Sequence, residues 1–194
     1  MTGKEFFEKT THTESGFIDE FFSILKEKRV DYCVIGGLAV NAYTEPVVTL
    51  DLDIVVVARK IKEFTEELKK HYTLREYPHS INVYSEKSDL RIQIQTAPEL
   101  QKCLDSATEK EVLGYKLLVA SIEDVFKSKI LAAMEPERRE SKRKKDHADL
   151  LRLIEVKTEL IELLPAELRK EISGNSLEKI PEKKIENDGP EIEL

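Results

Sequence analysis

Two aspartates separated by one residue, Asp51 and Asp53, lie in the β-branched stretch "LDLDIVVVA". This stretch predicts a strand, and side chains two positions apart in a strand leave from the same face. The two carboxylates repel each other unless a cation compensates them, and Mg²⁺ prefers carboxylate and phosphate oxygens. One interpretation is therefore a metal site, and the other is a solvated strand face without a ligand.

A glycine pair, Gly36 and Gly37, follows the apolar stretch "DYCVI" and precedes "LAVNAYT". We expect a short strand, a glycine turn and one or two helical turns. Glycines in such a turn let the backbone approach a ligand closely, and the free amides at a helix start favour phosphate. Because a tight strand-to-helix turn also requires glycine, the pair by itself leaves a phosphate site and a structural turn open.

A lysine occurs on an apolar helix face farther along the chain. The stretch "SIEDVFKSKILAAM" begins with a capping-box pattern and predicts a helix that carries Lys129 inside its apolar stripe. A second helix, predicted from about Lys144 to Leu164, places Asp146 on its apolar face, with Lys145 and Asp149 beside that face. Lys129 can extend to water, pair with a buried carboxylate such as Asp146, or reach a phosphate.

The elements that must position these residues are read from hydrophobic periodicity. We expect helices over about 15–28 and 60–71, a β-hairpin in "HSINVYSEKSDLRIQIQ" around the turn "EKSD", and a final short helix in "AELRKEI". This order of strands and helices predicts a mixed sheet with helices packed against it, an α+β (α/β) fold. Residues 1–14 form an N-terminal segment, 15–120 the core, 121–173 a helical portion packed on it, and 174–194 a disordered tail without a catalytic role.

The composition limits the class of function. The 194 residues are 40% hydrophobic and 36% charged, with a formal net charge of −7, which argues against nucleic-acid binding driven by overall charge. The link 138–145 holds six Lys/Arg against one acid and is either an RNA-steering patch or a solvated helix entry. The spacing of the two cysteines is not that of metal ligands, and we find neither a signal peptide nor a membrane span. We expect a cytoplasmic protein.

Together these motifs resemble a known family. An apolar strand followed by "GG", a short helix and "T-x-D-x-D" at Thr49 to Asp53 is similar to the nucleotidyltransferase fold related to DNA polymerase beta. The resemblance is greatest to the minimal nucleotidyltransferases and the AbiEii/AbiGii toxin-like proteins. "EDVFKSKILAA" and "KKDHADLLRLIE" resemble the lysine helix and the K-D-x-x-D helix of the same family. The similarity extends from about Asp31 to about Ile154.

The resemblance implies an activity and a set of site residues. It implies that a nucleoside monophosphate passes from an NTP to a hydroxyl of a tRNA, a protein or a small molecule, with release of pyrophosphate. It implies that Asp51 and Asp53 ligate Mg²⁺ and act in catalysis with Lys129. It also implies that the nucleotide is bound by Gly36, Gly37, Thr49, Lys129, Lys145, Asp146 and Asp149. The toxin-like relatives further imply a possible toxin–antitoxin partner.

Two positions depart from the family pattern. Val47 follows Pro46 where the family commonly has arginine, and Gln93 stands in "LRIQIQ" where a third metal carboxylate is usual. Either Asp89 or Glu99 replaces that carboxylate through a different hairpin register, or the enzyme works with two acids. A third alternative is a degenerate relative that binds nucleotide without turnover.

Overall fold

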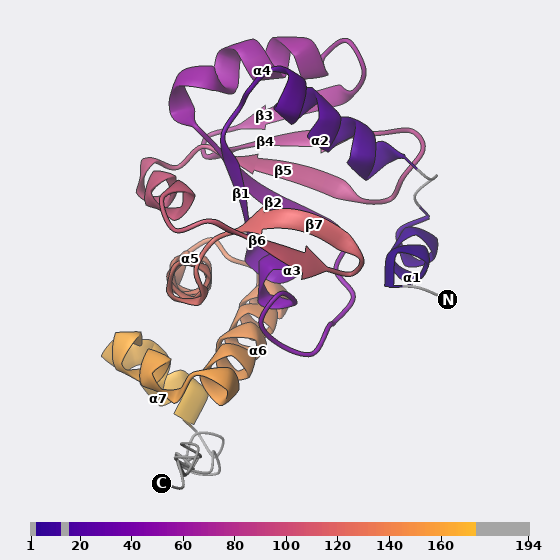
Figure 1. The fold of residues 1–194 in the computed structure, drawn as a ribbon. Coiled ribbons are helices and arrows are strands. Elements are labelled where there is room, and N and C mark those ends of the chain that lie inside the picture. The colour runs from indigo at the N-terminus through magenta and orange to yellow at the C-terminus, as the bar shows by residue number, and fades with distance from the viewer. Residues whose placement is uncertain (1–2, 13–15, 174–194) are drawn as a thin grey trace, which may run out of the picture.

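The computed structural model of the chain describes residues 3–12 and 16–173. Within them, one mixed sheet of seven strands has the order β3-β4-β5-β2-β1-β7-β6 (Figure 1). The strands are β1 (Tyr32–Ile35), β2 (Asp51–Val56), β3 (Thr73–Tyr77), β4 (Ser80–Tyr84), β5 (Arg91–Gln95), β6 (Thr108–Val112) and β7 (Tyr115–Val119). Helices pack against this sheet, which confirms the predicted fold class. The predicted tail, 174–194, lies outside the described residues.

Seven α-helices and three 3₁₀ segments are described along with the sheet. The α-helices are α1 (Gly3–Thr10), α2 (Phe17–Glu27), α3 (Gly36–Val40), α4 (Ile61–Leu68), α5 (Ile122–Met134), α6 (Glu140–Val156) and α7 (Ala166–Ser173). The 3₁₀ segments are η1 (Ala58–Lys60), η2 (Pro98–Leu104) and η3 (Thr158–Leu163). No helix among residues 3–12 and 16–173 has the length and apolar character needed to cross a membrane.

The centre of the sheet is formed by β1, β2 and β5. Strand β2 runs antiparallel to β1 and parallel to β5, and β5 runs antiparallel to β4, so the predicted β4–β5 hairpin is confirmed. Strands β3, β6 and β7 were not predicted. Strand β3 is an exposed edge strand that carries charges on both faces and therefore lacks the alternation by which half-buried strands are recognised.

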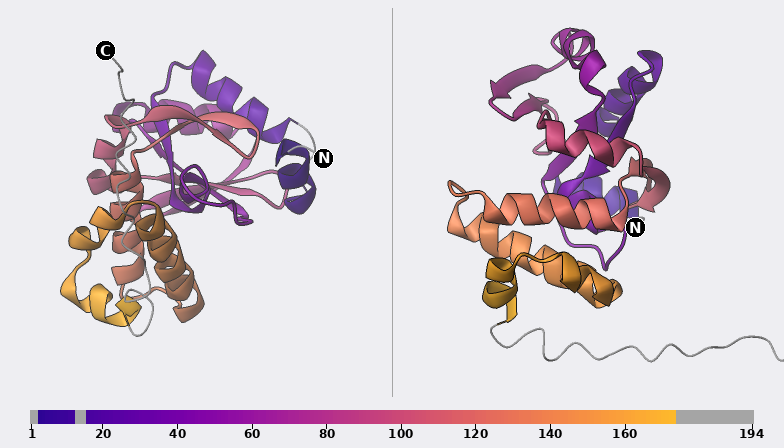
Figure 2. Two further views of the ribbon diagram at one scale, coloured as in Figure 1. Left: turned by 60° about the horizontal axis from the view of Figure 1, so that its bottom comes forward. Right: turned by 90° about the vertical axis from the view of Figure 1, so that its left-hand side faces the viewer.

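Apolar residues fill the two sides of the sheet. Phe21 of α2 and Phe64 of α4 are fully buried and meet edge to face over one side, where Ile54 of β2 is also fully buried. Helices α5 and α6 pack against each other on the opposite side, with α7 beyond them (Figure 2). The sheet thus has α2 and α4 on one side; on the other, α3 contacts β1 and β2, and α5 and α6 both contact α3.

The C-terminal helices differ in part from the prediction. The predicted capping box of α5 is confirmed, because the Ser121 hydroxyl accepts a hydrogen bond from the Asp124 amide. The predicted bounds of the next helix, 144–164, are wrong: α6 begins at Glu140 and ends at Val156. Lys157, directly after α6, has an extended backbone and pairs with Glu123 of α5. The helix therefore stops there, and η3 begins at the next residue. The predicted boundary at residue 120 falls between β7 and α5, and it stays a prediction.

Candidate functional site

The two aspartates of β2 lie side by side on one face of the sheet. Asp51 and Asp53 are partly buried, whereas Leu52 and Ile54 between and beside them are buried on the opposite face, as strand alternation requires. On the neighbouring strand β5, Arg91 is the register partner of Asp51, and Gln93 is the partner of Asp53. Gln93 therefore occupies the position opposite Asp53 at which the pattern described above has a carboxylate.

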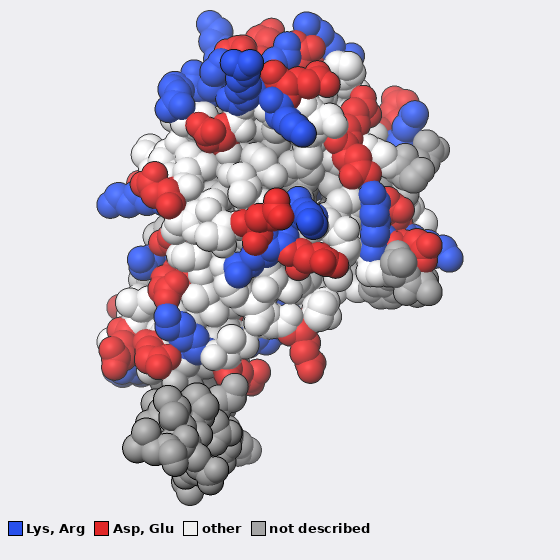
Figure 3. Space-filling model, in the orientation of Figure 1, with Lys and Arg blue, Asp and Glu red and all other residues white. Residues whose placement is uncertain are grey.

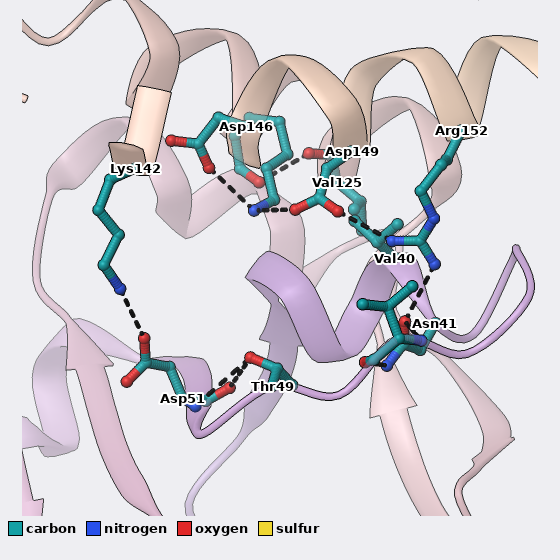
Figure 4. Close-up of polar contacts among 12 residues, drawn as sticks. Val40, Asn41, Thr49, Asp51, Val125, Lys142, Asp146, Asp149 and Arg152 are labelled. Carbon is teal, nitrogen blue, oxygen red and sulfur yellow. Dashed lines mark hydrogen bonds and ion pairs between the residues drawn. The ribbon is translucent and has the colours of Figure 1, made fainter. Parts of the chain in front are cut away.

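Asp51 is paired with two protein cations. Its Oδ1 lies 2.7 Å from Nη2 of Arg91, and its Oδ2 lies 3.2 Å from Nζ of Lys142, which reaches down from α6 (Figure 4). The Thr49 hydroxyl donates a hydrogen bond of 3.3 Å to the backbone carbonyl of Asp51. The repulsion expected between Asp51 and Asp53 is thus offset by side chains of β5 and α6.

Asp53 packs against the glycine turn. Its Oδ1 accepts a hydrogen bond of 3.0 Å from Gln95, and its Oδ2 lies only 2.1 Å from the place where a Cβ on Gly36 would stand. Burial raises the pKa of Asp53 above its ordinary value; the charge of Lys129 opposes this shift, and the charge of Asp51 adds to it. The Asp53 carboxylate is therefore held close to the first turn of α3.

The glycine pair forms that first turn. Gly36 begins α3 with a φ of +70°, a left-handed conformation that residues with a Cβ rarely adopt. A Cβ on Gly37 would lie 3.3 Å from the hydroxyl of Thr49 and 3.9 Å from Nζ of Lys145. A small hollow, open to solvent, lies here and is lined by Gly37, Asn41, Val47, Val48, Thr49, Lys145, Asp149 and Arg152. Its lining combines backbone, a hydroxyl, an amide and two cationic side chains with the carboxylate of Asp149.

Lys129 is buried between two helices. Its ammonium group lies 3.0 Å from Asp146 and 2.7 Å from Asp149, and all three side chains are almost fully buried. Burial by itself lowers the pKa of Lys129, but the facing charges of Asp149 and Asp146 outweigh it and raise the pKa. Of the alternatives open from the sequence, the ion pair with a buried carboxylate is the one that the structure contains.

Two arginines extend this buried network. Arg138 pairs with Asp146 at 2.6 Å, and Arg152 pairs with Asp149 at 2.9 Å. Arg152 also donates a hydrogen bond to Asn41 (Figure 4) and another to Thr44. The Asn41 side chain in turn bonds both backbone groups of Val47. The network therefore connects α5 and α6 to the loop that leads into β2.

Sequence reasoning named Lys145 and Asp149 but missed four other residues of this site, which are Lys142, Arg152, Arg91 and Gln95. Lys142, Lys145, Asp149 and Arg152 follow one another at helical spacing, so a single ridge of α6 faces the pocket and Asp51. The same periodicity that singled out Asp146 could have found Lys142 and Arg152. Arg91 and Gln95 alternate with Gln93 along β5, but only the pairing of β5 with β2 shows that they reach the aspartates.

The third carboxylate is not supplied by Asp89 or Glu99. Asp89 pairs with His12 at 2.8 Å, and Glu99 lies exposed in η2. Within residues 3–12 and 16–173, no group of three His, Cys, Asp or Glu side chains could hold a metal ion. Two carboxylates and an amide oxygen nevertheless match what Mg²⁺ requires when substrate phosphates complete its shell. The donor set is therefore compatible with one magnesium ion only when phosphate oxygens supply its remaining ligands.

The sequence matches no protein-family model, and no curated protein is similar enough to count as a relative. Solved structures do resemble the fold. The antibiotic-resistance factor ANT(2″)-Ia in solution has 15% identity and a TM-score of 0.55, over 80% of this chain and 89% of its own. The lincosamide antibiotic adenylyltransferase LnuA, bound to lincomycin, has 16% identity and a TM-score of 0.51, over 73% of this chain and 96% of its own.

A crystal structure of ANT(2″)-Ia with adenylyl-2″-tobramycin gives the same result, with 15% identity and a TM-score of 0.55. It covers 80% of this chain and 94% of the other. At these identities the likeness concerns the backbone. The glycine turn, the aspartate strand and the helices over them form a nucleotidyltransferase fold.

Proposed function

We propose that the chain is a magnesium-dependent nucleotidyltransferase, which moves a nucleoside monophosphate from an NTP to an acceptor hydroxyl and releases pyrophosphate. The contact between Asp53 and Gly36 carries this proposal, because a Cβ on Gly36 would displace the carboxylate. An acid held against a glycine helix start brings a metal ligand beside a phosphate-binding backbone. The fold shared with an adenylyltransferase supports the same reaction class.

In this proposal Asp51 and Asp53 hold Mg²⁺, and the Gln93 amide is the neighbouring oxygen donor. Bound there, the ion supplies electrostatic stabilisation of the charge that develops on the attacking and leaving oxygens. Arg91 orients Asp51 from β5, and Gln95 orients Asp53 by its hydrogen bond. The chain's own contribution is to fix two carboxylates on one rigid strand.

The triphosphate is assigned to the pocket at the start of α3. The Gly37 backbone, the Thr49 hydroxyl and Lys145 would bind its oxygens. Lys129 would act through its charge on Asp53 and through helix packing, since Asp146 and Asp149 already pair with its ammonium group. Asp149 would then hold Arg152, a basic side chain that lines the pocket, and Asp146 would hold Arg138.

The acceptor is a small hydroxyl compound in this proposal, rather than a tRNA or a protein. In the basic stretch 138–145, Arg138, Lys142, Arg143 and Lys144 have partners within the molecule, which leaves less of the stretch to steer RNA. Val47 and Val48 line the pocket while 50% and 44% exposed, an apolar rim suited to a small organic molecule. A toxin–antitoxin partner and a cytoplasmic location stay predictions.

Pyrophosphate release in the presence of Mg²⁺ tests the reaction. We expect the purified chain to release pyrophosphate from at least one NTP when a hydroxyl acceptor is supplied. Asp51→Asn should slow release at least about 100-fold, because it removes a charge worth several kcal/mol in the transition state. Asp31→Asn is the matched control, since Asp31 pairs with Arg59 on the surface. Equal rates for wild type and Asp51→Asn would contradict the proposal.

A second candidate is a nucleotide-binding module without turnover, including one that acts in a toxin–antitoxin pair. The position of Gln93 opposite Asp53 favours it, because the amide brings no negative charge to the metal site. Thermal stabilisation by NTP with Mg²⁺, in the absence of any pyrophosphate release from the four NTPs, would identify this alternative. Release from any of them would exclude it.

A further inference from the structure

The negative charge of Asp51 is neutralised by protein side chains as well as by the proposed metal ion. Both carboxylate oxygens already face protein cations, Arg91 at Oδ1 and Lys142 at Oδ2. A divalent ion on the same carboxylate would bring a third cation to one acid. Because like charges at such short range repel strongly, one of the two protein cations has to give way.

The two cations are not equivalent. Arg91 is the register partner of Asp51 on the adjacent strand and makes the shorter contact, 2.7 Å. Lys142 comes from a different element, α6; its contact is 3.2 Å long, and its side chain is 37% exposed. A lysine ammonium is also strongly hydrated and sits on a flexible stem, so water compensates its release more readily than that of a guanidinium. Lys142 is therefore the cation that exchanges.

A phosphate-binding position lies within one helical turn of Lys142. Residues three apart on a helix are neighbours, and Lys145 already lies at the glycine turn, with its Nζ 3.9 Å from the position of a Gly37 Cβ (Figure 4 shows Lys142 above Asp51). Two lysines side by side can bind one anion with charge-assisted hydrogen bonds. The released ammonium group thus has a destination at the same pocket.

We propose that Lys142 is a built-in counter-ion of Asp51, which leaves the carboxylate when Mg²⁺ binds and turns to the nucleotide phosphates. This inference rests on the proposed function, because it takes Asp51 as a metal ligand and the pocket at Gly37 as the phosphate site. It makes metal and nucleotide binding mutually supportive. Lys142 opposes binding of the metal alone and favours binding of the metal together with a triphosphate.

Binding of Mn²⁺ alone, followed by electron paramagnetic resonance in nucleotide-free protein, tests the first half. Lys142→Gln should bind Mn²⁺ about two- to fivefold more tightly than wild type, the factor expected when a partly exposed ion pair no longer competes. Lys142→Arg keeps the charge and should bind Mn²⁺ no more tightly than wild type, because a guanidinium is released less readily than an ammonium group. Lys144→Gln is the matched control, because Lys144 pairs with Glu140 on the exposed side of the same helix.

Binding of ATP at saturating Mg²⁺, measured by calorimetry, tests the second half. Lys142→Gln should weaken ATP binding about tenfold or more, as loss of a hydrogen bond to a charged group predicts, whereas Lys144→Gln should not. Unchanged Mn²⁺ affinity in Lys142→Gln, or unchanged ATP affinity, overturns the inference.

The two proposals fail in different ways. Tighter Mn²⁺ binding by a folded Lys142→Gln variant of a chain that releases no pyrophosphate supports the counter-ion role and contradicts the proposed function. If the wild type releases pyrophosphate but Lys142→Gln binds Mn²⁺ no more tightly than wild type, the proposed function is supported and the counter-ion role is contradicted. Thermal unfolding of each variant verifies that the fold is retained.

Discussion

At the scale of single residues, Gly36 determines how close Asp53 can come to the start of α3. Its φ of +70° strains any residue with a Cβ, and such a Cβ would lie 2.1 Å from Oδ2 of Asp53, so the carboxylate would have to move aside. Gly37 is less constrained, since a Cβ there would meet the Thr49 hydroxyl at 3.3 Å without an unusual φ. The two glycines that look alike in the sequence therefore have different roles.

Alanine substitutions distinguish these roles. Gly36→Ala should lower the free energy of unfolding by about 1–3 kcal/mol, the cost of a residue held in a sparsely populated backbone conformation, and more if Asp53 cannot move aside. Gly37→Ala should change it by less than about 1 kcal/mol, because alanine is favoured over glycine in a helix. Urea unfolding without metal measures both values. Equal losses in the two variants would contradict the assigned difference.

At the scale of elements, a buried ion network fastens α5 to α6. Lys129 of α5 faces two carboxylates of α6, and Arg138 and Arg152 complete the pairing of those acids. Periodicity alone placed Lys129 and Asp146 on the inner faces of their helices, because a helix face depends only on local spacing. Periodicity could not show that Lys129 also meets Asp149, since this depends on how the two helices cross.

Removing the central lysine should be costly. Lys129→Met leaves two buried carboxylates without their shared cation and should destabilise the chain by about 3–5 kcal/mol. Lys127→Met is the control: Lys127 lies on the same helix but is exposed and contacts Asp124 at 3.5 Å, so it should cost less than about 1 kcal/mol. Unfolding in guanidinium chloride compares the two variants. Similar unfolding midpoints for Lys129→Met and Lys127→Met would show that the network adds no stability.

At the scale of the whole molecule, charges of both signs are interspersed on the face seen in Figure 3, including the surface over α4. Several of them pair across elements. Glu67 of α4 lies 2.7 Å from Lys28, which follows α2, and 3.0 Å from Lys70. Hydrogen bonds from Lys28 and Lys70 lower the pKa of Glu67 to about 2. The tie between α2 and α4 is therefore acid-sensitive.

The pH dependence of stability follows from this shift. A carboxyl whose pKa is lower in the folded state stabilises the fold above its unfolded pKa, near 4.5, and loses this contribution as the pH falls to about 2. Glu67→Gln should therefore reduce the melting temperature at pH 7, and the difference from wild type should vanish near pH 2. Glu86→Gln, in the turn between β4 and β5, is the control. Thermal melting followed by circular dichroism from pH 2 to 7 measures the difference in melting temperature between wild type and Glu67→Gln. A difference that does not change with pH would contradict the role assigned to Glu67.

Much of the core was predictable because its signals are local. The runs that became β1 and β2 are apolar or rich in β-branched residues, those that became α2 and α4 have helical periodicity, and the glycine turn follows β1 at a recognisable place. The edge strand β3 and the hairpin of β6 and β7 were missed, and α6 was placed too late in the chain. These elements owe their bounds to neighbours, since edge strands and helix ends are stabilised by pairing and packing as much as by propensity.

By itself the sequence determined that Asp51 and Asp53 share a face, that two glycines precede them, and that Lys129 points inward. These are consequences of the short periods of strands and helices, which need no knowledge of the rest of the chain. Only the tertiary structure decided which charges meet. Lys142 reaches Asp51 across 91 positions of sequence, and Arg91 reaches it through the register of β5 against β2. Ion pairing acts over a few ångströms, so partners are set only once sheet and helices have packed.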